Sequence, residues 1–282
     1  MSDPDNATLA YDWPQLDAPL EQMDLNDLRQ QIDGVDRALL KLIHRRVDIG
    51  HQVGEIKRQT SDSPVFLRPA REAKMLRVLA QRHRDQGRAD FPTSTVLYVW
   101  RELIASTTAM EGTLRLSLMA DQNRTCRKNA VLHFSATLEQ INRSAGIEVL
   151  DDVLSGRAEL GVVALEDAWW QADNLGLAPG QAQVFARLPF IDEPAQRLNG
   201  VAETTFTIAK FGLEEPTGDD VTLVVVEDPT QLQAHQSLQI LDKRNGKSLV
   251  AVPGYLSAED LGDAGTPGTA KIIGRYARPI VL

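Results

Sequence analysis

The feature that points most directly to chemistry is an arginine in an otherwise apolar helical seam. Between Asp24 and Arg58, apolar residues recur in steps of three and four, the spacing of a coiled-coil seam. The seam comprises Leu25, Leu28, Ile32, Val35, Leu39, Leu42, Ile49, Val53 and Ile56. The position that follows Leu42 in this pattern is occupied by Arg46. A guanidinium group there costs free energy unless an anion meets it.

Lys57 brings a second cation to nearly the same face. It follows Arg46 by 11 residues, which is about 20° past three full turns at roughly 100° per residue. Two cations that point into the core of a helix bundle predict a binding site for a small, strongly anionic molecule. The alternative is that Arg46 is a structural arginine, either paired with an acid or extending its head group to the edge of the seam.

Three helices are expected to position these residues. The first runs over residues 24–58, with Asp24 as its N-cap. The second begins near Pro69 and ends by Gly87, and the third covers residues 92–111. The inward stripe of the third helix is Val96, Trp100, Leu103, Ile104, Thr107 and Glu111. The first helix would be about 52 Å long at 1.5 Å per residue, and two short helices of the same chain cannot cover it. We therefore expect an intertwined homodimer.

After Gly112 the pattern changes to short apolar segments typical of strands. The expected strands are 114–119, 160–165, 206–209, 221–226 and 249–252, with helices at 135–142 and 146–155 between them. The expected fold class is therefore α+β multidomain. Residues 1–23 are expected to form a disordered or loosely docked arm, residues 24–112 an all-α three-helix domain, and residues 113–282 an α/β domain.

Charge and composition narrow the classes of partner. Residues 24–112 carry 15 basic and 12 acidic residues, a net charge of +3, whereas residues 113–282 carry 15 basic and 22 acidic residues, a net charge of −7. This asymmetry favours an anionic ligand for the helical domain and argues against nucleic acid. The sequence contains no apolar run long enough to cross a membrane. Its acidic N-terminal segment does not have the pattern of a signal peptide. The single cysteine, Cys126, excludes an internal disulfide. A cytoplasmic location is expected.

Three motifs in the helical region resemble the all-α chorismate mutase family, which occurs alone or fused to prephenate dehydratase. They are Leu28-Arg29-x-x-Ile32-x-x-x-Asp36, Val53-Gly54-x-x-Lys57 and Pro69-x-Arg71-Glu72. The resemblance covers roughly residues 25–112. It implies that chorismate, a dianion, rearranges to prephenate for phenylalanine and tyrosine synthesis, without a metal or a cofactor. Such a site holds a reactive conformer and stabilises charge on the breaking ether oxygen.

The resemblance also implies roles for individual residues. Two arginines bind the two carboxylates: Arg46 from one protomer and Arg29 from the other, with Arg71 nearby. Their separation of 17 residues turns the two side chains roughly 100° apart on one helix, so Arg29 points away from its own chain's site. Lys57 is expected to donate to the ether oxygen. Glu72 accepts from the ring hydroxyl, and its neighbour Arg71 keeps it ionised.

Three further positions complete the expected site. Thr107 takes the place of a small hydroxyl residue that lies near the substrate in the family. Glu111 stands where many members have a glutamine donor, and a carboxyl group donates only when it is protonated. Burial must therefore raise the pKa of Glu111, or activity must fall as pH rises. Arg68 stands where some members have an acid, and it is expected to be a further carboxylate clamp or simply exposed.

Residues 113–282 resemble a degenerate prephenate dehydratase. The segment from Gly156 to Asp167 is similar to one in that family that ends Pro-Ile-Glu-Asn, and Thr204-Thr205-Phe206 lies where the family shows Thr-Arg-Phe. The arginine is missing, and no glycine-rich opening follows the first strand. We therefore expect no dehydratase activity. An unrelated α/β domain is the alternative.

Two other functions remain open. Isochorismate pyruvate lyase uses a related helical fold and a related pericyclic step, although the Arg71-Glu72 pair fits chorismate better. The chain is alternatively a non-catalytic partner that regulates another enzyme of the shikimate pathway.

Overall fold

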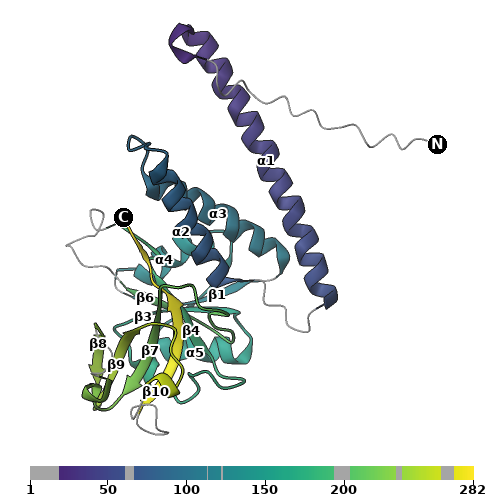
Figure 1. The fold of residues 1–282 in the computed structure, drawn as a ribbon. Coiled ribbons are helices and arrows are strands. Elements are labelled where there is room, and N and C mark those ends of the chain that lie inside the picture. Colours follow the sequence, from purple (N-terminus) through teal and green to yellow (C-terminus); the bar gives the residue numbers. More distant parts are fainter. Residues whose placement is uncertain are drawn as a thin grey trace. The chain divides into compact units, whose positions relative to one another are not determined.

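The structure is a computed structural model that describes residues 19–60, 67–112, 114–121, 123–193, 204–232, 237–261 and 270–282. The chain divides into two compact units, residues 1–62 and 63–282 (Figure 1). Most of the expected arm, residues 1–18, lies outside the described residues.

The first unit contains a short 3-10 helix, η1 (Leu20–Gln22), and one long helix, α1 (Leu25–Thr60), of 36 residues. The predicted N-cap is confirmed. The Oδ1 atom of Asp24 accepts hydrogen bonds from the backbone N–H groups of Asn26 at 2.7 Å and Asp27 at 2.9 Å. The side chain of Asp27 in turn accepts from the N–H of Asp24 at 3.3 Å. This reciprocal pair satisfies N–H groups that the first turn leaves without helical partners.

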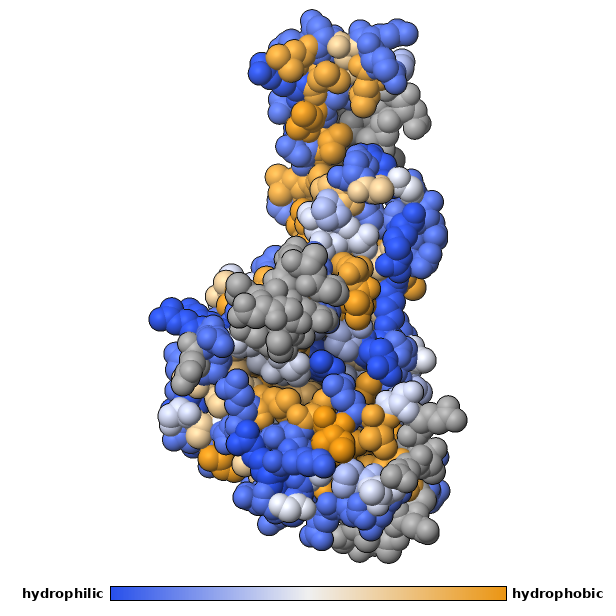
Figure 2. Space-filling view, turned by 90° about the vertical axis from the view of Figure 1, so that its left-hand side faces the viewer, coloured by the Kyte–Doolittle hydropathy of each residue, from blue (hydrophilic) through white to orange (hydrophobic). Residues whose placement is uncertain are grey.

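The apolar seam of α1 is exposed within this chain. Its exposed members are Leu25, Ile32, Leu39, Leu42, Ile49, Val53 and Ile56, and they range from 39% to 64% exposed. Apolar side chains are visible along α1 in the uppermost part of Figure 2. Since a long amphipathic helix gains most of its stability from burying its apolar face, α1 lacks the cover that it needs.

The second unit begins with two helices, α2 (Pro69–Asp85) and α3 (Thr93–Glu111). Proline at the first helical position of α2 is as predicted, and the bounds of both helices agree with the sequence analysis. A nine-stranded sheet and two further helices, α4 (Thr125–Phe134) and α5 (Gly146–Ser155), follow. The helix predicted at 146–155 is confirmed to the residue.

The sheet has the order β2-β1-β3-β6-β4-β10-β7-β9-β8. Its strands are β1 (Arg115–Met119), β2 (Glu139–Arg143), β3 (Leu160–Ala164), β4 (Gln183–Leu188), β6 (Thr205–Ala209), β7 (Asp220–Val226), β8 (Gln239–Arg244), β9 (Lys247–Pro253) and β10 (Ala270–Ala277). A separate pair joins β5 (Ile191–Asp192) to β11 (Ile280–Val281). Strands β1, β2 and β3 are parallel, whereas most other pairs are antiparallel. The five predicted strands are all present, and the α+β fold class is confirmed.

The helix predicted at residues 135–142 is wrong. Helix α4 ends at Phe134, and Ser135 adopts a φ of 73°, in the left-handed region that stops a helix. Residues Glu139–Arg143 then form β2, which pairs in parallel with β1 at the edge of the sheet. A polar edge strand needs no apolar alternation, so periodicity alone did not identify it.

Helices α2 and α3 share one core with the sheet. Leu76 of α2, Leu97 of α3 and Phe134 of α4 belong to the same buried cluster as Leu116 and Leu118 of β1. Helix α5 packs into a second cluster with Trp169, Trp170 and Phe206. The compact unit therefore starts before α2. The predicted domain boundary at 112/113 assumes that a second chain completes the helical domain. It stays a prediction.

Within the described part of the chain, no helix has both the length and the apolar character required to cross a bilayer.

Candidate functional site

The first unit carries three of the expected site residues on one uninterrupted helix. Arg29 is exposed on α1, whereas Arg46 and Lys57 are half-buried. Because α1 has no break between them, the helical angles expected from the sequence apply, and Arg46 and Lys57 share a face. The second unit contains the other candidates: Arg68, Arg71, Glu72, Thr107 and Glu111.

Glu72 is held by an arginine that the sequence analysis did not identify. Its Oε2 atom accepts a hydrogen bond from Nη1 of Arg101, on α3, at 2.7 Å. The side chains of Arg101 and Glu72 are only 3% and 12% exposed. The cation in contact with Glu72 is thus Arg101 and not its neighbour Arg71, which is exposed on α2, and the expected role of Arg71 stays a prediction. A buried carboxylate needs a paired cation, and Arg101 supplies it from a neighbouring helix.

The signal for Arg101 was present in the sequence. Arg101 follows Leu97 by four residues and precedes Ile104 by three, and both of these apolar residues are buried. It is therefore an arginine on an apolar stripe, the same signal that singled out Arg46. The stripe expected for α3 included the buried Ile104 and Thr107, but it also included Trp100, which is 37% exposed, and it omitted Leu97.

A cavity of about 20 Å³ lies beside this ion pair. Glu72, Arg101, His133 and Phe134 contribute to its lining, together with apolar residues of α2 and the sheet. Burial holds the pKa of His133 well below its usual range, and the nearby cation of Arg101 lowers it further. His133 is therefore neutral at physiological pH. The cavity has room for about one water molecule.

The guanidinium group of Arg68 forms an ion pair with a carboxylate of the same chain. Its Nη1 atom lies 2.6 Å from Oε1 of Glu214, and this pair is partly exposed. A role as a substrate clamp requires that this ion pair open first, and it stays a prediction.

Thr107 is buried on α3 and donates its hydroxyl proton to the carbonyl oxygen of Leu103 at 2.6 Å. A hydroxyl committed in this way would meet a ligand as an acceptor. Glu111 ends α3, and its side chain lies outside the described part of the structure.

In the α/β part, the loop after β1 and strand β6 carry side chains that hydrogen bonds within the chain hold in place. Asp121, in the loop after β1, accepts hydrogen bonds from the N–H groups of Asn123, Thr125 and Cys126 at 3.1, 2.7 and 2.8 Å. A carboxylate thus occupies the N-terminus of α4, a position that otherwise attracts anions. Thr205 is fully buried on β6 and accepts from Nδ2 of Asn129 at 3.1 Å.

Comparison with known proteins agrees with the helical motifs. Residues 28–112 match the family model of chorismate mutase type II. A bifunctional chorismate mutase/prephenate dehydratase from Pseudomonas aeruginosa is 31% identical over 157 residues, which are 55% of this chain and 42% of that protein. A protein of the same description from Aquifex aeolicus is 24% identical over 144 residues, which are 51% of this chain and 39% of that protein. The chain thus spans about two fifths of the length of these relatives.

The similarity to the Pseudomonas aeruginosa protein extends beyond the helical region, since 157 aligned residues exceed the 112 that precede residue 113. Among solved structures, a prephenate dehydratase from Arthrobacter aurescens in complex with L-Phe covers 60% of this chain and 92% of its own, at 14% identity and a TM-score of 0.42.

Proposed function

We propose that the chain, whose residues 28–112 form a chorismate mutase type II domain, converts chorismate to prephenate as a cytoplasmic homodimer in aromatic amino-acid biosynthesis. The observation that carries the proposal is the pair of half-buried cations, Arg46 and Lys57, on one face of α1. A guanidinium group binds a carboxylate through two parallel hydrogen bonds, and an ammonium group can donate to the ether oxygen as its bond to carbon breaks. These two functions meet the needs of a unimolecular rearrangement of a dianion.

The proposed homodimer rests on α1. Its seam residues are 39% to 64% exposed within one chain, and their heptad spacing is suited to a second helix. A partner α1 would bury the seam and bring the partner's Arg29 toward the site that contains Arg46. The site would then be built from two chains.

The proposal is tested by mixing the purified full-length chain with chorismate and following the loss of chorismate's ultraviolet absorbance and the appearance of prephenate. A parallel reaction with isochorismate, in which pyruvate is measured, separates a mutase from a lyase. If a folded dimer turns over neither substrate, the remaining function is that of a non-catalytic regulatory partner.

Mixed dimers test the origin of the two arginines. Arg29→Ala and Arg46→Ala chains are each expected to be inactive as homodimers. Unfolded and refolded together, they should regain partial activity, because one of the two sites in each heterodimer then has both arginines. The measurement is chorismate turnover by heterodimers isolated with two different affinity tags. Verified heterodimers without activity would show that each site is built from one chain.

Residues 113–282 are expected to show no prephenate dehydratase activity, although the relatives described above are named for both activities. The expected arginine is replaced by the buried Thr205, and the carboxylate of Asp121 accepts the N–H groups at the N-terminus of α4 that could otherwise bind an anion. The measurement is phenylpyruvate formed from prephenate near neutral pH. Formation above the uncatalysed background would contradict this prediction.

A further inference from the structure

Helix α2 is fastened to the α/β part of the second unit by a row of basic side chains. Arg68 pairs with Glu214 at 2.6 Å, and Lys74 pairs with Glu215 at 3.1 Å. The third and most extensive contact is made by Arg77, one helical turn beyond Lys74. The acceptors all belong to residues 214–219, which precede β7, or to Arg278, which follows β10.

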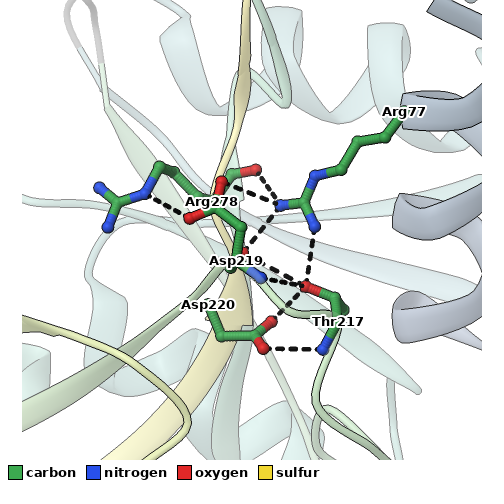
Figure 3. Close-up of polar contacts among 5 residues, drawn as sticks. All are labelled: Arg77, Thr217, Asp219, Asp220 and Arg278. Atoms are coloured by element: carbon green, nitrogen blue, oxygen red, sulfur yellow. Dashed lines mark hydrogen bonds and ion pairs between the residues drawn. The ribbon is translucent and has the colours of Figure 1, made fainter. Parts of the chain in front are cut away.

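Arg77 differs from its neighbours in the kind of partners that it binds (Figure 3). Its Nη1 atom donates to the hydroxyl of Thr217 at 2.8 Å, and its Nη2 atom donates to the carbonyl oxygens of Asp219 and Arg278, both at 2.8 Å. The carboxylate of Asp219 lies 3.7 Å from Nη2, and the side chain of Arg77 is 24% exposed. Backbone carbonyl oxygens are fixed in position, so the planar guanidinium group is held in one orientation.

The segment that receives Arg77 is itself held in place. Asp220 is buried, and its carboxylate accepts from both the N–H and the hydroxyl of Thr217. Arg278 donates from Nε to Oδ1 of Asp219 at 2.8 Å, and its N–H donates to the carbonyl oxygen of Asp219 at 2.9 Å. Arg77 therefore connects α2 to an ordered corner of the sheet and not to a loose loop.

The first turn of α2 carries Glu72, five residues before Arg77. This separation is about 7.5 Å along the helix axis. Arg101 holds the carboxylate of Glu72 from α3, and α2 itself is held by its packing in the core and by its contacts with residues 214–219 and 278. In a catalysed rearrangement a displacement of about 1 Å can reduce the rate on the order of 10²-fold.

We propose that the α/β part of the chain positions Glu72 for the mutase reaction by anchoring α2, and that Arg77 is the positioning residue. This role rests on the proposed function. Under this proposal the α/β part takes no part in the reaction. It supports α2, the helix that carries Glu72.

The test compares Arg77→Ala, Arg77→Lys and Arg82→Ala in the full-length chain. Arg82 is the matched control, since it is an exposed arginine on the same helix whose side chain makes no hydrogen bond or ion pair within the described residues. We expect kcat/KM for chorismate to fall by about tenfold or more in Arg77→Ala. Arg77→Lys should be intermediate, because one ammonium group cannot reproduce the fixed fork of a guanidinium. Arg82→Ala should equal the wild type.

Hydrogen exchange of the α2 amides supplies the second readout. Exchange in residues 71–77 should become faster in the same order as the activity falls, while β7 and β10 retain their protection. Unchanged kcat/KM in Arg77→Ala, or an equal loss in Arg82→Ala, would overturn the positioning role. Inactive wild-type protein would instead refute the proposed function, and the positioning role would fall with it.

Discussion

Replacement of Arg46 by alanine is expected to abolish chorismate turnover and to leave the fold intact. Arg46 is a half-buried guanidinium group in the seam of α1, where the neighbouring seam positions are leucine and isoleucine. A bidentate contact with a carboxylate is lost in Arg46→Ala, and the remaining groups cannot hold the substrate's compact conformer. Folding should be unaffected or slightly favoured, because removal of a cation from an apolar seam removes a desolvation cost.

Arg45→Ala is the matched control for this experiment. Arg45 is the preceding residue on α1 and is exposed, and its side chain is turned about 100° away from that of Arg46. Circular dichroism verifies the fold of both variants, and kcat/KM for chorismate is measured at equal dimer concentration. If Arg46→Ala retains more than about a tenth of the wild-type kcat/KM, the loss is below about 1.4 kcal/mol, and Arg46 is not a carboxylate anchor.

Elements with local signals were predictable from the sequence. Asp24 forms the cap expected of an acidic residue before an apolar seam, and Pro69 begins α2 because its missing N–H has no helical partner to lose. Strands such as β3, which is buried throughout, were recognisable as continuous apolar runs. In each of these cases the residues that determine the element belong to the element itself.

Features that depend on distant residues were not predictable. β2 exists because β1 offers it a parallel partner, and its own polar sequence carries no periodic signal. The cation that contacts Glu72, Arg101, is separated from it by 29 positions in the chain, so no local pattern connects the two residues. The expected site residues are also divided between α1 and the second unit. The seam of α1 is exposed within this chain, and what covers it depends on residues outside the helix.

Some of the charges that make the sequence asymmetric pair with one another in the structure. The net charge of +3 on residues 24–112 was interpreted as attraction for an anionic ligand. Part of that positive charge, on Arg68 and Lys74, faces Glu214 and Glu215 of the acidic α/β part. Part of the excess positive charge of residues 24–112 therefore binds helix α2 to the α/β part.

Loss of Arg101 is expected to destabilise the second unit by about 3–5 kcal/mol, the range for removal of one member of a buried ion pair. In Arg101→Met the carboxylate of Glu72, only 12% exposed, loses the cation at 2.7 Å. The measurement is the free energy of unfolding in urea. Arg88→Met is the control, because Arg88 pairs with Asp90 in an exposed turn and should leave the unfolding free energy unchanged. Equal effects of the two substitutions would show that burial does not determine the strength of the pair.

The double variant Arg101→Met/Glu72→Leu separates stability from function. Two Arg101 nitrogens, Nε and Nη2, are buried without a hydrogen-bond partner among the described residues, so the native pair is incompletely satisfied. Replacement of both charges by apolar groups removes this cost, and the double variant should recover the stability lost in Arg101→Met and equal or exceed the wild type. It should nevertheless fail to turn over chorismate, because the ring hydroxyl loses its acceptor. A stable, inactive double variant would mean that this buried ion pair is retained for the site and not for the fold, whereas full activity would remove Glu72 from the proposed mechanism.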